Sequence, residues 1–221
     1  MVNYSVSEEN YIKAIFRLQG ENETVTTNAL AQELLTKPAS VTDMMKKLKT
    51  KKLLHYQPYQ GFRLNGEGKK VALGIIRRHR LWEYFLSEKL KFDWGEVHEV
   101  AEELEHVSSK KLIDKLDEYL GYPKFDPHGD PIPDVHGKME DYNRISLVDL
   151  PFNVFAEVCH VGNQSSEMLE LLRHKNISLG TRLETKRKFA FDNSIEIKIR
   201  QQSAFTISEQ LAKNIFVKYG S

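Results

Sequence analysis

Between residues 7 and 53, apolar side chains recur at helical spacing in three separate segments, and this order restricts the possible folds more than any other feature of the chain. Ser7 is the expected N-cap of the first helix, and Pro38 falls in the first turn of the third. Two β-prone arms follow within residues 53–65 and predict a hairpin. Together they predict a winged helix-turn-helix, whose helices are expected at residues 7–18, 26–35 and 38–53.

The third predicted helix is the candidate for DNA recognition, because the second helix of a helix-turn-helix pair lies in the major groove. Small and hydroxyl side chains can approach base edges, whereas lysines suit phosphates. A lysine-rich helix is often only a solvated face, but the surrounding pattern favours DNA binding. In the wing, Tyr59 and Arg63 are expected to reach the DNA backbone or the minor groove. The expected exposed positions on the helix are Pro38, Ala39, Ser40, Thr42, Asp43, Lys46 and Lys47.

Charge is divided unevenly along the chain, although the net charge is only +1. Residues 1–80 contain 14 Lys and Arg against 7 Asp and Glu, whereas residues 81–144 contain 8 against 16. Residues 145–221 are nearly balanced, with 10 basic and 8 acidic side chains. A basic first segment suits a polyanion such as DNA, and an acidic second segment suits a cation.

The acidic segment places histidine and glutamate on one face of each of two expected helices. The first helix begins after Asn65, its expected N-cap, and carries His79 and Glu83 one turn apart. Imidazole and carboxylate together suit Mn(II), Fe(II), Co(II), Ni(II) or Zn(II). One such face is more often a surface face, but two on adjacent helices favour a metal, which would remove the repulsion among the glutamates. On the second helix, expected over residues 93–107, the face consists of His98, Glu102, Glu105 and His106.

The remaining features narrow the class of protein. The single cysteine, Cys159, excludes an internal disulfide and a cysteine-based zinc module. Apolar runs are far shorter than the roughly 20 residues of a membrane helix, and the N-terminus lacks the pattern of a signal peptide, so we expect a cytoplasmic protein without membrane contact. Residues 145–221 contain short, partly alternating stretches typical of strands. Three isolated histidines are expected to be surface or packing residues: His136, His160 and His174.

The chain resembles the diphtheria toxin repressor family of metal-dependent transcriptional regulators, which includes the manganese transport regulators. The stretches that carry the resemblance are SVTDMMKKLKTKKLL, LNGEGKKVALGIIRRHRLWEYFL, VHEVAEELEHVSS and GYPKFDPHGDPIP. It implies a mainly α fold with β structure: a winged helix-turn-helix at 1–70, a helical dimerisation and metal-binding domain at 71–130, a linker at 131–144 and a small SH3-like, FeoA-like β-barrel at 145–221.

The resemblance also implies a function. Such a protein is not an enzyme and has no small organic substrate. Mn(II) or Fe(II), at two sites per subunit, favours a homodimer that occupies an operator in double-stranded DNA and represses metal-uptake genes. Zn(II), Co(II) or Ni(II) are expected to replace the physiological metal in vitro.

The implied primary metal site consists of Glu102, Glu105, His106 and the residue before the aromatic side chain of the first helix, Asn10. Manganese-type members carry Asp at the last of these positions and iron-type members carry Met. The amide oxygen of Asn10 brings no charge, so its neighbour Glu9 is an alternative ligand. Iron-type members carry Cys where this chain has Glu102, and the harder carboxylate favours Mn(II).

The implied ancillary metal site begins with His79, Glu83 and His98. Two sets of side chains are available to complete it. In members with a barrel, the ligands come from the loop matching GNQSSEMLELL, which here supplies Gln164 and Glu167. Some manganese-responsive members use instead the residues that correspond to Asp126 and His128 in FDPHG. The sequence leaves both sets open.

Two other classes of function compete with this interpretation. A metalloenzyme, for example a hydrolase that uses the His/Glu cluster, would lack a nucleophile–base pair and leave the helix-turn-helix unexplained. A winged-helix regulator that senses a small organic ligand would have an acidic face that is merely solvated. Tight, stoichiometric binding of Mn(II) in equilibrium dialysis separates a metal-dependent repressor from the second class.

Overall fold

The computed structural model describes residues 4–20, 24–57, 61–107, 109–140, 143–162, 165–200 and 202–220. The chain forms two compact units. The first unit comprises residues 1–79, 103–114 and 133–138, and the second comprises 80–102, 115–132 and 139–221. Boundaries fall inside three helices, and each unit is built from segments that are distant in sequence.

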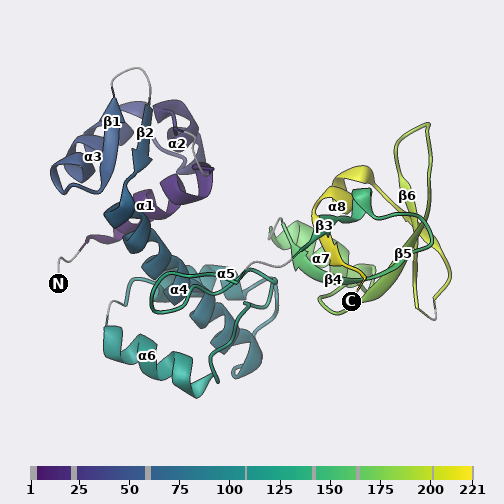
Figure 1. Cartoon of the computed structure of the whole chain (residues 1–221). Helices are drawn as coiled ribbons and strands as arrows, with labels where there is room; N and C mark the ends of the chain where they lie inside the picture. The colour runs from purple at the N-terminus through teal and green to yellow at the C-terminus, as the bar shows by residue number, and fades with distance from the viewer. Residues whose placement is uncertain are drawn as a thin grey trace. The chain divides into compact units, whose positions relative to one another are not determined.

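The first unit contains the predicted winged helix-turn-helix. Its hairpin is antiparallel, with Leu54 opposite Leu64, and lies next to the third helix (Figure 1). Buried side chains from all five elements form one core, including Ile12, Leu30, Met45 and Phe62. The elements are α1 (Val6–Leu18), α2 (Thr27–Glu33), α3 (Pro38–Thr50), β1 (Leu54–Gln57) and β2 (Gly61–Leu64).

The first helix begins earlier than predicted. Its N-cap is Ser5 and not Ser7, because a reciprocal pair of hydrogen bonds forms two residues upstream. The Ser5 hydroxyl accepts from the Glu8 N–H, and the Glu8 carboxylate accepts from the Ser5 N–H at 2.8 Å. This capping box satisfies two backbone donors that the helix itself leaves open.

Three further helices follow: α4 (Gly66–Glu88), α5 (Val97–Leu104) and α6 (Lys110–Tyr119). The predicted N-cap of α4 is confirmed, since the Asn65 side chain accepts from the Gly68 N–H at 3.0 Å. The prediction of one helix over residues 93–107 was too long, because α5 ends at Leu104. The carbonyl of Glu105 accepts from Nε of Arg78, and the chain turns at this point. Glu105 and His106 therefore follow the helix and are not part of it.

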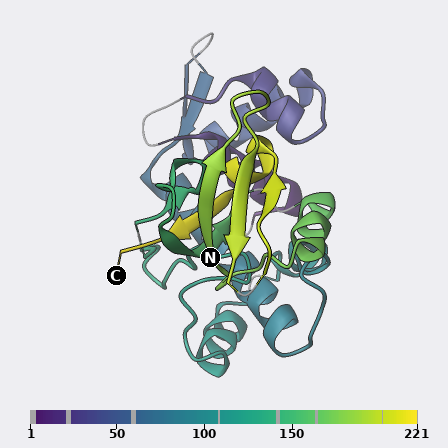
Figure 2. The ribbon, with the colours of Figure 1, turned by 90° about the vertical axis from the view of Figure 1, so that its right-hand side faces the viewer.

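The second unit includes a small β domain built on a sheet of order β3-β8-β4-β5-β6-β7, in which neighbouring strands are antiparallel (Figure 2). Its core contains Val158, Leu169, Ile197 and Val217. This agrees with the predicted C-terminal β-barrel domain. Among the described residues, no helix is long and apolar enough to cross a membrane. The elements are β3 (Ile145–Ser146), η1 (Leu147–Asp149), β4 (Phe155–Val161), α7 (Ser166–His174), β5 (Arg182–Lys188), β6 (Ile195–Ile199), β7 (Phe205–Ile207), α8 (Glu209–Lys213) and β8 (Ile215–Lys218).

Candidate metal centre and DNA-binding face

The α3 helix presents most of the predicted DNA-binding side chains to solvent. Thr42 differs from the prediction: it is half-buried, and its hydroxyl donates to the Pro38 carbonyl of the same helix at 3.0 Å. Arg63 is exposed on β2, and Tyr59 lies outside the described residues. The exposed residues of α3 include Pro38, Ala39, Ser40, Asp43, Lys46 and Lys47.

Two lysines of the α3 region also join this helix to α1. Lys47 Nζ lies 3.2 Å, and Lys51 Nζ 2.6 Å, from Oε1 of the buried Glu8. Burial opposes ionisation of this carboxyl group, but hydrogen bonds from Lys51, from the Ser5 N–H and from Lys47 outweigh it and lower the pKa of Glu8 to about 2. Glu8 is therefore an ionised link between the two helices.

The Glu105 cluster, defined here as Glu105, Lys13 and His79, lies within the first unit. Both oxygens of Glu105 accept from Lys13 Nζ, at 2.7 and 2.8 Å, and Oε2 lies 2.7 Å from His79 Nδ1. All three residues are buried. Burial alone would raise the pKa of Glu105, but the hydrogen bond from His79 and the charge of Lys13 lower it. The cluster is therefore a buried carboxylate matched by a cation of the chain.

A second carboxylate, Glu9, lies beside this cluster. Its Oε2 is 2.7 Å from His106 Nδ1, and its Oε1 is 2.7 Å from Arg78 Nη2. Asn10, the predicted ligand, is half-buried, and its side-chain oxygen has no hydrogen-bond partner in the described part of the chain. The structure thus brings His106 together with Glu9, the alternative ligand. Lys13 was not among the predicted site residues, although its spacing of four residues from Glu9 on one helix places both on the same face.

The Glu83 cluster, defined as Glu83, His98, Asp126 and His128, belongs to the second unit. The Glu83 side chain is only 1% exposed, with Oε1 3.0 Å from His98 Nδ1 and 4.0 Å from His128 Nε2. His98 Nε2 in turn lies 3.6 Å from Glu102, and His128 is fully buried. On α4, His79 stands one helical turn before Glu83. The buried carboxylate of Glu83 thus has ring nitrogens of His98 and His128 at 3.0 and 4.0 Å.

The loop that carries Asp126 and His128 is fixed against β4. The Val161 N–H donates to the His128 carbonyl at 3.0 Å. Gly129 follows with a φ of +86°, and a Cβ atom at this position would lie 2.0 Å from the Cys159 carbonyl oxygen. Only glycine therefore permits this close approach. The backbone contact holds the two candidate ligands in place.

Charged neighbours and burial shift the pKa values of two aspartates in this loop, Asp126 and Asp130. Arg80 lies 3.5 Å from Asp126 and 3.3 Å from Asp130, and His160 Nε2 lies 3.3 Å from Asp130. Burial, together with the charges of Glu83 and Asp130, raises the pKa of Asp126 well above its ordinary value. Burial opposes ionisation of Asp130, but His160 and Arg80 outweigh it and lower its pKa to about 2. Asp130 thus carries the negative charge that Arg80 and His160 share.

The other candidate residues lie at the surface or outside the described part. Glu167 is exposed in the first turn of α7, and Gln164 lies outside the described residues. His136 and His174 are exposed, as predicted for surface residues. His160 packs against Phe216, with ring centroids 5.1 Å apart, and its ion pair with Asp130 was not predicted.

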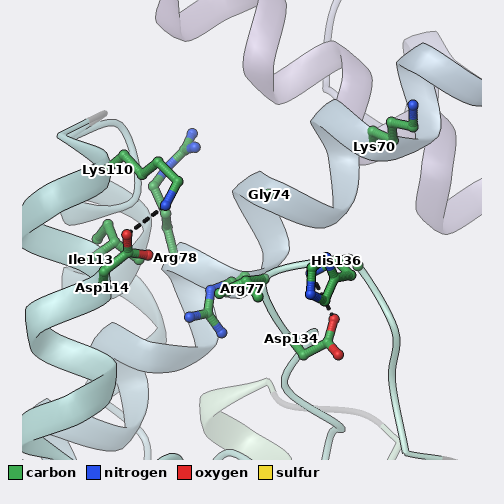
Figure 3. Close-up of a pocket in the computed structure, with 11 residues that line it drawn as sticks. Lys70, Gly74, Arg77, Arg78, Lys110, Ile113, Asp114, Asp134 and His136 are labelled. Atoms are coloured by element: carbon green, nitrogen blue, oxygen red, sulfur yellow. Dashed lines mark hydrogen bonds and ion pairs between the residues drawn. The ribbon is translucent and has the colours of Figure 1, made fainter.

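A cavity of about 520 Å³ opens between α4, α6 and residues 134–137 of the first unit (Figure 3). Arg77 donates to the Pro133 carbonyl at 2.9 Å on one side, and Lys110 pairs with Asp114 at 2.6 Å on the other. Asp134 accepts from backbone N–H groups of the same loop. These charged groups thus form hydrogen bonds and an ion pair with other groups of the same unit.

Three family models match successive parts of the chain. The iron dependent repressor N-terminal DNA binding domain matches residues 4–62, and the iron dependent repressor metal binding and dimerisation domain matches residues 65–134. The FeoA domain matches residues 145–219. Together these models cover most of the sequence.

The chain is also similar to known metal-dependent repressors and to their solved structures. The HTH-type transcriptional regulator MntR of Bacillus subtilis is 30% identical over 139 residues, which are 62% of this chain and 97% of that protein. The diphtheria toxin repressor of Corynebacterium efficiens is 25% identical over 186 residues, covering 80% of this chain and 81% of that one. A manganese-dependent transcriptional repressor solved in complex with manganese superimposes with a TM-score of 0.85 at 29% identity, covering 96% of this chain and 99% of that one.

Proposed function

Because the chain belongs to the iron-dependent repressor family of DNA-binding transcriptional regulators, which are not enzymes, we propose that it is a homodimeric repressor of metal-homeostasis genes that occupies its operator when a divalent metal is bound. The functional division that we propose follows the sequence. Residues 1–70 bind DNA, and residues 71–130 bind metal and form the dimer. Residues 131–144 are the linker to the β domain, which residues 145–221 form. The ranges matched by the family models support it.

The observation that carries this proposal is the Glu83 cluster. A carboxylate that is 1% exposed has imidazole nitrogens at 3.0 and 4.0 Å. A buried carboxylate is unfavourable without a compensating positive charge, and a divalent cation between these donors would supply one. Oxygen and nitrogen donors suit Mn(II) or Fe(II), and also Zn(II), Co(II) or Ni(II).

The ligands we propose for this metal are His79, Glu83 and His98, completed by Asp126 and His128. The last pair is favoured over Glu167 and Gln164 because His128 is buried within 4.0 Å of Glu83, whereas Glu167 is exposed. Bound metal would lower the pKa of Asp126 and recruit its carboxylate as a further oxygen donor. The other predicted ligands are Glu102, Glu105, His106 and Asn10. They would form a second metal site only if the ammonium group of Lys13 were displaced from the Glu105 carboxylate.

The DNA-binding and dimer surfaces that we propose follow from exposure. On α3, Ser40, Asp43 and Lys46 face solvent and are available to DNA. On α6, Leu112 and Tyr119 are seven residues apart on one face and are exposed. A two-fold axis through this face would pair two recognition helices, as an operator with two half-sites requires.

The test is DNA binding as a function of free metal. Duplexes are first selected from a random-sequence library in the presence of Mn(II). Binding of the selected duplex is then measured anaerobically with metal-stripped protein and after addition of Mn(II), Fe(II), Zn(II) or Co(II). We expect binding only with metal, and Mn(II) or Fe(II) to act at the lowest free concentration. Equal affinity with and without every metal would reject the proposal.

A further inference from the structure

The first helix contributes a buried lysine to a carboxylate that the family resemblance assigns to a metal. Lys13 Nζ lies 2.7 Å from one oxygen of Glu105 and 2.8 Å from the other. The two side chains are 6% and 0% exposed. A lysine is almost never buried unless it is paired, and here both oxygens of its partner are used. The carboxylate is thus already bound by a cation that belongs to the chain.

The neighbouring carboxylate is matched in the same way. Arg78 Nη2 lies 2.7 Å from Glu9, and Nε of Arg78 donates to the Glu105 carbonyl. Two carboxylates, Glu9 and Glu105, therefore face one ammonium group and one guanidinium group before any metal is added. The formal charges of these four groups sum to zero, so the carboxylate of Glu102, within 4.8 Å of Glu105, is the negative group near them that they leave for a metal.

We propose that Lys13 is the resident cation at the Glu105 carboxylate and keeps divalent metal from binding that carboxylate, so that the metal signal enters only through the proposed site at Glu83, of which His79 is also a ligand. The inference rests on the proposed function, since it requires the Glu83 cluster to bind metal. It assigns to Lys13 a role in metal stoichiometry: the lysine determines how many metal ions the chain binds.

Two physical effects support this role. A protonated lysine has three donors and no electron pair for a metal, and its charge repels a cation placed among the same oxygens. A divalent ion would therefore have to expel the ammonium group from a buried position. Lys13 joins α1 to Glu105, the residue that follows α5, and this contact needs no metal.

The test counts Mn(II) ions bound per chain, by equilibrium dialysis of metal-stripped full-length protein at fixed free Mn(II). Four forms are compared: wild type, Lys13→Met, Glu105→Gln and the double variant. Lys13→Met keeps the length of the side chain and removes the charge. We expect Lys13→Met to bind one more ion than wild type, and the double variant to lose that ion again. Glu105→Gln alone should bind as many ions as wild type. Lys70→Met removes an exposed lysine that pairs with Glu67 at 2.8 Å, and it should change nothing.

Thermal unfolding gives a second readout. Mn(II) should raise the melting temperature of Lys13→Met more than that of wild type, because the gained ion replaces the lost ammonium group. Loss of one ion in Glu105→Gln alone, or no gain in Lys13→Met, would overturn the inference and leave the proposed function intact. Should Lys13→Met fail to fold, the count for Glu105→Gln decides. Absence of Mn(II) binding in every form would instead reject the proposed function, and the role of Lys13 with it.

Discussion

At the scale of single residues, two imidazole rings approach the carboxylate of Glu83. Because Glu83 is buried, its charge is stabilised by positive groups or by a metal. His98 and His128 approach it with ring nitrogens at 3.0 and 4.0 Å. A metal would supply positive charge and bind all three side chains at once.

At this scale we expect Glu83→Gln to weaken activation of DNA binding by Mn(II) by at least about 10-fold, since it removes the charged donor and keeps the shape. The measurement is the free Mn(II) concentration at half-maximal binding of the selected duplex. Glu99→Gln on α5 is the matched control, because Glu99 is exposed. The same midpoint in both variants would remove Glu83 from the proposed metal site.

At the scale of elements, the α1 and α3 helices are joined by ion pairs as well as by their apolar core. The ionised carboxylate of Glu8 accepts from Lys47 and Lys51 and also closes the capping box of α1. One side chain of α1 therefore positions α3 on α1. The lysines near the end of α3 divide between this link and the solvent.

The link has a pH dependence that can be measured. The pKa of Glu8 is about 2 in the folded chain, below its ordinary value of 4.5, so its ionised form stabilises the fold above pH 4.5. That contribution decreases as the pH falls from 4.5 towards 2. We expect Glu8→Gln to reduce the free energy of unfolding at pH 7 by on the order of 1–3 kcal/mol. In urea unfolding the difference from wild type should be smaller at pH 3, whereas a difference that is equal at both pH values would contradict the role of the charge. Glu33→Gln, an exposed change on α2, should have little effect.

The exposed lysines of α3 belong to the same scale. Lys46 pairs with the exposed Asp43, at 3.1 Å, and such surface pairs are weak. We expect Lys46→Ala to weaken DNA binding on all sequences and to reduce the slope of affinity against salt by about one counterion. The measurement is duplex binding at several salt concentrations. Lys213→Ala, on α8 of the β domain, is the control. An unchanged slope would place the phosphate contacts elsewhere.

For the whole molecule, the proposed function requires two copies of the chain. The Leu112 side chain is 42% exposed on α6 and has an apolar partner, Tyr119, on the same face. Leu116, on the same helix, is buried within the protomer. The face available to a partner is therefore the outer side of α6.

We expect Leu112→Glu to convert the dimer to a monomer, because it places a charge at the centre of an apolar interface. Sedimentation velocity in the presence of Mn(II) measures this directly. Leu171→Glu is a close control, since Leu171 is also 42% exposed and lies on α7 of the β domain. A Leu112→Glu protein that remains dimeric would move the interface away from α6.

The sequence by itself determined the elements and the chemical types of the candidate ligands. Helical spacing of apolar residues is a local property, so the three helices and hairpin of the first unit could be predicted. The same holds for the pairing of His79 with Glu83 on one helix. The N-cap at Ser5 also has a local signature, because Glu8 follows it three residues later. The end of α5 at Leu104 has none, and there the Glu105 carbonyl accepts from Arg78, a distant residue of α4.

Only the tertiary structure decided which charges meet. Lys13 and Glu105 are 92 residues apart in sequence, and Glu9 and His106 are 97 apart. Such pairs depend on how the helices pack, and packing is not encoded in the spacing of any one segment. An isolated lysine in an amphipathic helix appears solvated from its sequence. Once α1 is packed in the folded unit, that lysine becomes a buried cation against the carboxylate that the sequence assigned to a metal.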